Sequence, residues 1–545
     1  MKPALLAALI ASALAAAPAP QPAAAPPAPG TPASPAPAGT PPATGAPAAG
    51  TPAPGTPPAA PADAPPGATP DASDAGTPSS AAPATLPPKV DPKIFDEGLS
   101  LYFTANYKEA ARRFYAYLEA MPQTDDNYAW AQYFLGQSLV KLKLTHAGAY
   151  YLARIARERS NPEVVPRALE GLRELIDKPH DETMIDEQVF AALDLGFVGG
   201  ETGDYANYQQ GLLDLRAGNE RWANTHFTKV TEGTSAASRS RFAVLVTRLK
   251  DAREINQELI QSFWELGHDT KLSLETRNEA LLAAARLRYE KKDFKGALDA
   301  YRQVKLPALD PGQASLYLEE AWTRYNLGEI HTAMGVLTTL DAPSFRDEFL
   351  PDKYLLRAMI FRDLCHYLPA KRAAKELTRK FAESLEAIRE RDDLTRDLRM
   401  VRAASSIGPT RRAYRFYEAL QLEGENLGRY AGSFGDRLYG HLNRLYVLAV
   451  AEAQRVYEAR LRDSVRQEAD KLVRAAEQVR IMDYEIGLKL YERIKRGSKL
   501  VKEVEEPPLT PKEAGFPFDG EYWNDELRDY RVSLKSRCIE GGVDQ

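Results

Sequence analysis

Long apolar runs and a strong charge of either sign are both missing from this 545-residue chain. The longest apolar run extends from Ala4 to about Ala15, whereas a membrane-spanning helix needs roughly 20 apolar residues. We therefore expect no integral membrane span in the mature chain. The formal net charge is only −5, so the chain lacks the basic surface that nucleic-acid-binding proteins carry, and we expect no nucleic-acid partner.

Cysteine is almost absent. The chain has only Cys365 and Cys538, and two cysteines cannot form the disulfide framework of a small secreted domain. In an oxidising compartment the two could pair, although they lie far apart in the sequence. Whether they do so is left open by the sequence.

Catalytic signatures are also missing. None of the seven histidines lies in an H-E-x-x-H motif, and no cysteine or carboxylate spacing completes a metal site. His366 follows Cys365, but neighbours on a helix point about 100° apart and cannot readily act as nucleophile and base. Gly428, Gly432 and Gly435 lack the order of a phosphate-binding loop, so we interpret them as turns. We expect no catalytic residue, metal or cofactor.

A wall-cleaving enzyme such as a soluble lytic transglycosylase is the enzymatic alternative, because such enzymes combine a helical solenoid with a lysozyme-like domain. That domain must be compact and must bury a catalytic Glu. The C-terminal part of this chain reads as one long helix and a short tail, which leaves no room for it. We therefore favour a non-enzymatic function.

Two N-terminal segments have distinct compositions. Residues 1–17 carry a cation at Lys2, an apolar run and small residues at Ala13 and Ala15, which is typical of a secretory signal peptide. Residues 18–88 hold 24 of the 40 prolines and no aromatic residue. Such a segment cannot bury enough apolar surface to fold, and we expect a disordered Pro/Ala-rich tether. The composition, heavy in Ala, Arg and Pro, suggests a bacterium, so export predicts a periplasmic location, with association to the outer membrane or cell wall.

Small, aromatic and proline residues recur at fixed spacings from residue 98 onwards. The first series is Gly98, Leu101, Tyr107, Ala110, Phe114 and Pro122. It resembles the tetratricopeptide repeat (TPR), a pair of helices whose signature contains G-x2-Y, A-x3-F and then P. The small residues of such a unit lie where its two helices cross, and the aromatic residue fills the space beside the next unit.

The spacing of two small residues followed by a large one returns along the chain. The further sets are Gly136, Gly148 and Leu152; Gly211, Ala223 and Phe227; Ala285, Ala297 and Tyr301, with Phe294 in the place of Tyr107; Ala321, Ala333 and Leu337; and Ala358, Ala370 and Ala374. Their first members are 38, 75, 74, 36 and 37 residues apart, and the double steps leave room for degenerate units near residues 173 and 248. We predict an all-α, TPR-like α-solenoid over 89–375; a helical bundle with alanines aligned by chance is the alternative.

A helical connector over 376–436, with an irregular glycine-containing stretch, and a long helix over 437–497 are expected next. Apolar residues seven apart indicate a two-helix packing seam in the long helix: Val465, Leu472, Val479 and Ile486, with Leu461, Ala475 and Met482 beside them. The partner of this seam is either the preceding helices of the same chain or a second molecule, so a homo-oligomer through the long helix stays open.

An aromatic-rich tail closes the chain over 498–545. Its rings are Phe516, Phe518, Tyr522, Trp523 and Tyr530. Aromatic side chains at this density either fold back on an apolar surface of the same chain or fill a groove on a partner. The stretch "YRVSLKS" could form a short strand that adds to the edge of another protein's sheet.

An array of this kind behind a Pro/Ala tether, closed by "FPFDGEYWNDELRDYRVSLKSRC", resembles the periplasmic TPR proteins of myxobacteria and their relatives. Some of these belong to the adventurous gliding-motility machinery. The resemblance implies a scaffold that links inner-membrane and outer-membrane components.

The sequence thus favours a periplasmic scaffold that binds a peptide or helix of envelope proteins in the solenoid groove. The alternative is an adaptor for cell-wall or outer-membrane biogenesis. The side chains that we predict to contact a partner are Tyr102, Arg112, Tyr133, Arg288, Arg324 and Trp523.

Overall fold

The computed structural model describes residues 93–159, 161–252, 254–307, 310, 312–406, 408–495, 520–523 and 527–538. Within these ranges every regular element is a helix, which confirms the predicted all-α class. The predicted signal peptide and tether lie outside the described residues, as does most of the tail. No described helix is both long and apolar enough to cross a membrane.

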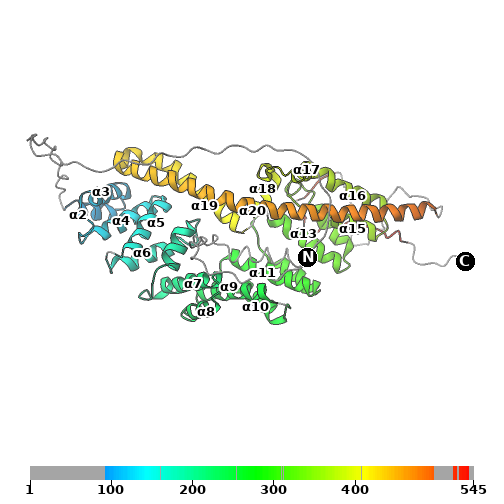
Figure 1. The fold of residues 1–545 in the computed structure, drawn as a ribbon, viewed down its shortest axis with the longest axis horizontal. Coiled ribbons are helices and arrows are strands. Elements are labelled where there is room, and N and C mark those ends of the chain that lie inside the picture. The colour runs from blue at the N-terminus through cyan, green and yellow to red at the C-terminus, as the bar shows by residue number, and fades with distance from the viewer. Residues whose placement is uncertain are drawn as a thin grey trace, which may run out of the picture. The chain divides into compact units, whose positions relative to one another are not determined.

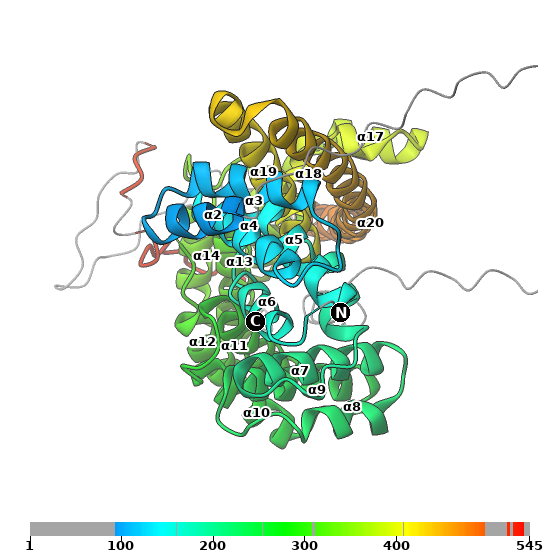
Figure 2. The same cartoon turned by 90° about the vertical axis from the view of Figure 1, so that its left-hand side faces the viewer.

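Helix pairs joined by short turns form a solenoid-like array (Figures 1 and 2). The pairs are α2 (Lys93–Phe103) with α3 (Tyr107–Ala120), α4 (Tyr128–Lys141) with α5 (Thr145–Glu158), α7 (Gly200–Arg216) with α8 (Glu220–Phe227), α11 (Leu274–Glu290) with α12 (Phe294–Gln303), α13 (Gly312–Asn326) with α14 (Ile330–Thr339), and α15 (Pro351–Asp363) with α16 (Tyr367–Lys380). The two double steps contain α6 (Val164–Arg173) with the π-helix η1 (Thr183–Ala191), and α9 (Ser235–Asp251) with α10 (Gln257–His268).

The turn inside each of the six pairs contains one residue with a left-handed backbone. These residues are Ala105, Lys143, Gly218, Lys292, Gly328 and Cys365, with φ between 59° and 79°. Their separations are 38, 75, 74, 36 and 37 residues, the same as those between the small residues that define the repeat in the sequence. A left-handed residue commonly ends a helix. Backbone geometry and sequence pattern therefore repeat in the same register.

The small residues of the repeat lie where the helices of a pair meet. A Cβ atom on Gly98 would lie 2.8 Å from Cε1 of Phe114, and one on Gly211 would overlap the ring of Phe227. The buried members of the pattern are Gly98, Ala110, Phe114, Gly136, Gly148, Leu152, Gly211, Ala223, Ala285, Ala297, Tyr301, Ala321, Ala333, Leu337, Ala358, Ala370 and Ala374. Leu101, Tyr107, Phe227 and Phe294 are half-buried, and Pro122 is exposed after the end of α3.

The connector is more regular than its sequence suggests. It contains α17 (Ala382–Glu390), η2 (Leu394–Arg396), α18 (Leu398–Ser405), α19 (Gly408–Leu427) and η3 (Gly428–Tyr430), followed by α20 (Ala431–Lys495). The expected irregular stretch was wrong for residues 408–427, because burial of one face of α19 outweighs its glycine content. Gly428 does begin a turn and Gly435 interrupts α20 with φ of 70°, but Gly432 lies within the helix.

The partner of the predicted heptad seam is the chain itself. All of the seam residues from Leu461 to Ile486 are buried against α15, α16 and α18 (Figure 1). Phe349, Ala374 and Met400 are among the side chains that complete this core. These heptads therefore offer no surface to a second molecule.

The N-terminal part of α20 packs on the opposite end of the array. Leu438, Leu442 and Tyr446 belong to one buried cluster with Phe114 and Leu135 of α3 and α4. Helix α20 thus contacts both the first helix pairs and the last one.

Ion pairs attach the α19–α20 hairpin between these ends. The carboxylate of Glu182 lies 2.9 Å from Nε of Arg412 and 3.0 Å from an Nη atom of Arg460. Arg411 of α19 pairs at 2.8 Å with Asp310, which precedes α13. The hairpin is therefore fixed to the middle of the array as well.

The described part of the tail folds back on the array. Residues 527–529 form a turn and residues 530–538 have no regular structure, so no strand is present in this segment. The backbone N–H of Val532 donates to the carbonyl oxygen of His331 at 3.0 Å, and Leu534 is buried between α13 and α14. The expectation of a strand was wrong because these backbone groups are satisfied by helix termini and side chains of the same chain.

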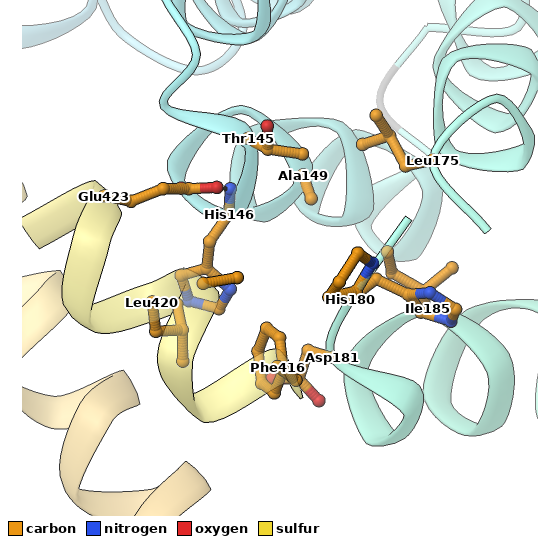
Figure 3. Close-up of a pocket in the computed structure, with 12 residues that line it drawn as sticks. Thr145, His146, Ala149, Leu175, His180, Asp181, Ile185, Phe416, Leu420 and Glu423 are labelled. Atoms are coloured by element: carbon orange, nitrogen blue, oxygen red, sulfur yellow. Dashed lines mark hydrogen bonds between the residues drawn. The ribbon is translucent and has the colours of Figure 1, made fainter. Parts of the chain in front are cut away.

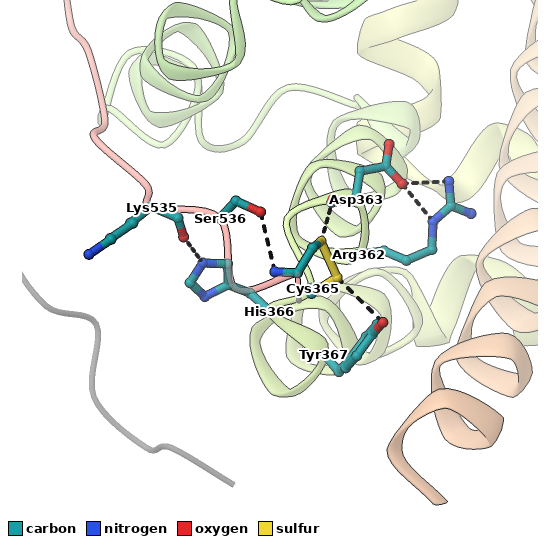
Figure 4. Close-up of a disulfide and its surroundings, with 8 residues drawn as sticks. Arg362, Asp363, Cys365, His366, Tyr367, Lys535 and Ser536 are labelled. Carbon is teal, nitrogen blue, oxygen red and sulfur yellow. Dashed lines mark hydrogen bonds and ion pairs between the residues drawn. A yellow bond between two sulfur atoms is a disulfide. The ribbon is translucent and has the colours of Figure 1, made fainter. Parts of the chain in front are cut away.

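A disulfide between Cys365 and Cys538 ends this docked segment (Figure 4). Nε2 of His366, beside Cys365, lies 2.7 Å from the carbonyl oxygen of Lys535. The question that the sequence left open is thus answered, since the two cysteines are paired.

Candidate partner-binding site

A cluster of aromatic rings lies across the first two helix pairs, on α2 and α4. The ring centroids of Tyr102 and Phe134 are 5.0 Å apart, those of Tyr133 and Phe134 are 5.3 Å apart, and those of Trp130 and Phe134 are 6.0 Å apart. Phe103 reaches the same ring of Phe134 at 6.2 Å. We call these five residues the aromatic cluster.

Helical spacing explains why these rings gather. Trp130, Tyr133 and Phe134 stand at positions i, i+3 and i+4 of α4, so they share one face. Leu135, next to them in sequence, is instead buried in the core of the array. On α2, Tyr102 lies in the last turn and Phe103 is its final residue. The close packing of α2 against its neighbours brings this last turn beside α4.

The aromatic cluster is only partly covered. Phe103 is 75% exposed, and the four other rings are half-buried. Burial, together with the nearby Tyr133, raises the pKa of Tyr102, and burial likewise raises the pKa of Tyr133, an effect that Arg167 opposes. Both phenols are therefore neutral hydrogen-bond donors at physiological pH.

A cation borders the aromatic cluster. The guanidinium of Arg167, on α6, lies 5.2 Å from the centroid of the Trp130 ring. The surface thus combines apolar ring faces, two hydroxyl groups and one guanidinium. Tyr, Trp and Arg are the side chains most enriched at the energetic centres of protein interfaces.

Two of the predicted partner-binding residues belong to the aromatic cluster, and Arg112 does not. Tyr102 and Tyr133 come from different helix pairs, and Phe134 lies between them. Arg112 is on α3, the second helix of its pair rather than the first, where it is exposed and forms an ion pair with Glu109 at 2.9 Å.

The other predicted contact residues are placed elsewhere. Arg288 lies 4.3 Å from the centroid of the Trp264 ring and donates to the carbonyl oxygen of Gly296. Arg324 is only 5% exposed. The prediction of Arg324 as a groove residue was wrong, because its guanidinium is taken up by an ion pair with Glu329 at 2.7 Å.

Trp523 lies on the tail, outside the aromatic cluster. Its backbone N–H donates to the hydroxyl of Tyr530 at 2.9 Å, and its side chain is 49% exposed. Sequence reasoning missed Phe103, Trp130 and Phe134. The run "YAWAQYF" carries the signal, since four aromatic residues in seven exceed what one buried helix face can hold.

No known protein family and no curated protein matches the chain. The assignment of a function therefore depends on the residues and their geometry. Among the described residues, no group of three or more His, Cys, Asp and Glu side chains lies close enough to hold a metal ion.

A small pocket lies between α5, η1 and α19, beside several titratable groups (Figure 3). Its free space is about 10 Å³, which is room for about one water molecule. Oε2 of Glu423 accepts hydrogen bonds from the backbone N–H of His146 at 2.9 Å and from the Tyr446 hydroxyl at 2.8 Å. Burial raises the pKa of Glu423 and lowers that of His146. These hydrogen bonds hold α19 against α5. The pocket itself is too small for an organic substrate.

A second buried polar network lies at the π-helix η1. Oδ1 of Asp186 accepts a hydrogen bond from the Tyr205 hydroxyl at 2.6 Å, and its Oδ2 lies 3.2 Å from Nε2 of His180. The amide of Gln209 donates to the hydroxyl of Tyr205 at 2.6 Å. Every member is satisfied within the network, which is typical of a structural role.

Proposed function

We propose that this protein is a non-enzymatic scaffold of the bacterial cell envelope, exported to the periplasm, which holds envelope proteins together. Its resemblance to the periplasmic repeat proteins of myxobacteria places gliding motility first among the machineries to test. The observation that carries the proposal is the aromatic cluster. Phe103 extends the half-buried rings into an apolar patch bordered by Arg167, and apolar patches with a polar rim mark interaction sites.

The contacts within the chain favour the aromatic cluster, rather than the middle of the groove, as the partner-binding site. The α19–α20 hairpin already engages the first pairs, η1 and the last pair. Phe103 and Tyr133 are not part of the cluster that packs on α20, and Phe103 stays exposed. An apolar anchor of a partner segment, such as a Leu, Phe or Pro side chain, would pack on the exposed ring of Phe103, while the hydroxyls of Tyr102 and Tyr133 would donate to its backbone carbonyls.

The paired cysteines support export. Disulfides persist in oxidising compartments and are rare in the bacterial cytosol. Cys365 and Cys538 are the only cysteines of the chain, and the structure pairs them.

Site-specific crosslinking in living cells tests the proposal. A photo-reactive phenylalanine analogue replaces Phe103 in one strain and Trp222 in a control strain, since Trp222 is 63% exposed on α8. We expect position 103 to capture a fixed set of envelope proteins that position 222 does not capture. Phe103→Ser should abolish co-purification of the same proteins and leave the melting temperature within about 2 °C, because Phe103 is 75% exposed.

Each alternative gives a different result. Capture of wall-synthesis or outer-membrane insertion factors at position 103 would replace the scaffold proposal by the adaptor function. Capture of the same proteins at positions 103 and 222 would remove the aromatic cluster as the binding site. Cleavage of purified cell wall by the wild-type chain would contradict a non-enzymatic function.

A further inference from the structure

The C-terminal turns of α20 carry an exposed apolar stripe. Its members and their exposed fractions are Ile481 at 62%, Tyr484 at 69%, Leu488 at 47%, Tyr491 at 65% and Ile494 at 58%. We call this set the α20 stripe. Single exposed apolar residues are normal on protein surfaces, but a contiguous row of five large ones marks a contact surface.

The α20 stripe and the buried seam lie on opposite faces of the same helix. Val479, Met482 and Ile486 of the seam are at most 4% exposed and pack on the array. At 3.6 residues per turn, Tyr484 and Leu488 point roughly 180° away from Ile486. The helix is therefore apolar on two sides, and its own array covers only one of them.

The spacing within the α20 stripe suits a second helix. Ile481 and Leu488 are seven residues apart, and so are Tyr484 and Tyr491, with steps of three and four between them. These four residues have the a/d spacing of a coiled-coil seam, with an aliphatic residue at both a positions, and Ile494 stands at the g position beside them. The occupant that matches such a seam is another α-helix with the same repeat.

Charges beside the α20 stripe determine the orientation of that helix. Arg480 stands at a g position, and Glu485 and Glu492 stand at e positions. In an antiparallel pair the e positions of the two helices face each other. This would bring Glu485 and Glu492 of one copy close to the same two residues of the other copy, and their negative charges would repel. In a parallel pair of identical helices, each g position faces an e position, so Arg480 of one copy faces Glu485 of the other. Glu485 also lies 3.5 Å from Arg362 of its own chain, but its side chain is 53% exposed and can be reached by a second cation.

We propose that a second copy of this chain binds along the α20 stripe, in a parallel two-helix contact. The exposed part of five large side chains amounts to roughly 600 Å² per copy, so that the contact would bury about 1,200 Å² in total, the lower limit of a standard-sized interface. The contact is independent of the aromatic cluster and goes beyond the proposed scaffold function. It would give each assembly two aromatic clusters.

Sedimentation velocity of the full chain over a range of concentrations tests the proposal. We expect a concentration-dependent dimer for the wild-type chain. Leu488→Glu should raise the dimer dissociation constant by about 100-fold or more, because it buries an unpaired carboxylate from each copy. Leu448→Glu is the matched control: Leu448 is 72% exposed on the same helix, outside the α20 stripe, and its variant should dimerise like the wild type.

A cysteine at position 484 tests the orientation. In the Tyr484→Cys chain this is the one unpaired thiol, since Cys365 and Cys538 are bonded to each other. Mild oxidation should give a disulfide-linked dimer, because a parallel seam places residue 484 of one chain beside residue 484 of the other. Arg480→Glu should weaken the dimer, and Arg480→Glu with Glu485→Arg should restore it.

Three results would overturn the proposal. One is a wild-type chain that stays monomeric at all concentrations and whose melting temperature falls in the Leu488→Glu variant, because the stripe is then covered within one molecule. Another is a monomer with an unchanged melting temperature. The third is a dimer that Leu488→Glu and Leu448→Glu affect equally, which would place the contact elsewhere.

Discussion

Cys365 and Cys538 are 173 residues apart in sequence, yet their Cα atoms lie 5.1 Å apart and their sulfur atoms are bonded. Cys365 occupies the left-handed turn position of the α15–α16 pair, at φ of 59°. The repeat geometry therefore presents one cysteine at a turn, where the end of the docked tail reaches it.

Removal of this disulfide should destabilise the protein. Closing a loop of this length restricts the unfolded chain, and native disulfides typically contribute about 2–5 kcal/mol. We expect the Cys365→Ser, Cys538→Ser double variant to lose that much free energy of unfolding in urea titration. A reducing agent should lower the stability of the wild-type chain by a similar amount and leave the double variant unchanged. Equal stability of both chains under oxidising conditions would show that the bond contributes nothing.

Gly335→Ala should detach the tail. A Cβ atom on Gly335 of α14 would overlap the backbone carbonyl of Tyr530. Elsewhere in a helix the same change stabilises by about 0.5–1 kcal/mol, and Gly440 of α20, with nothing within 4 Å, is the matched control. Hydrogen exchange of residues 527–538 should rise at least tenfold in Gly335→Ala and stay unchanged in Gly440→Ala. An unchanged tail in both variants would contradict the docked arrangement.

Glu182→Gln should loosen the hairpin from the array. Glu182 forms ion pairs with both Arg412 and Arg460. The side chain of Arg412 is 37% exposed, and those of Glu182 and Arg460 are less exposed. We expect a loss of about 1–3 kcal/mol in the free energy of unfolding, because two guanidinium groups would lose their counter-charge. Glu452→Gln breaks an exposed pair with Arg455 on α20 and should leave the free energy of unfolding nearly unchanged, because solvent screens that pair. Losses of similar size would mean that the Glu182 pairs are solvated in solution.

Stability should decrease at alkaline pH because of His180. Burial lowers the pKa of His180, but the hydrogen bond to and the charge of Asp186 outweigh this effect and raise the pKa to about 9. A histidine in the unfolded chain titrates near pH 6.5, so the stabilisation is complete below that pH and is lost as the pH rises through 9. Between pH 6 and 10 the wild-type chain should lose on the order of 2–3 kcal/mol more than His180→Gln does. Parallel profiles for the two chains would refute this role of the ion pair.

Short-range sequence patterns were sufficient to predict the helix pairs. Gly98, Ala110 and Phe114 mark a helix crossing because close approach of two backbones requires small side chains, and that requirement is visible in the sequence. The left-handed turn at Ala105 lies seven residues after Gly98, because the first helix of the pair ends there. In the candidate site, Tyr102 and Tyr133 were accessible to sequence reasoning because each stands on the first helix of its pair.

The packing of helices that are far apart in the chain could not be predicted from such patterns. Val479 and Tyr484 both belong to apolar rows of one helix, and composition does not distinguish the row that packs on the array from the one that stays exposed. Arg324 has the helical slot of a groove residue, but its burial beside Glu329 depends on how α13 meets α14.

The sequence by itself therefore determined the helical class, the period of the array and the heptad character of the last helix, since each depends on contacts between residues close in the chain. Only the tertiary structure decided that the α19–α20 hairpin packs on the array, that the tail is held by Gly335 and Cys365, and which apolar surfaces remain uncovered. Those outcomes depend on contacts between helices far apart in the chain, where many pairings satisfy the same apolar pattern and only the simultaneous fit of all of them selects one.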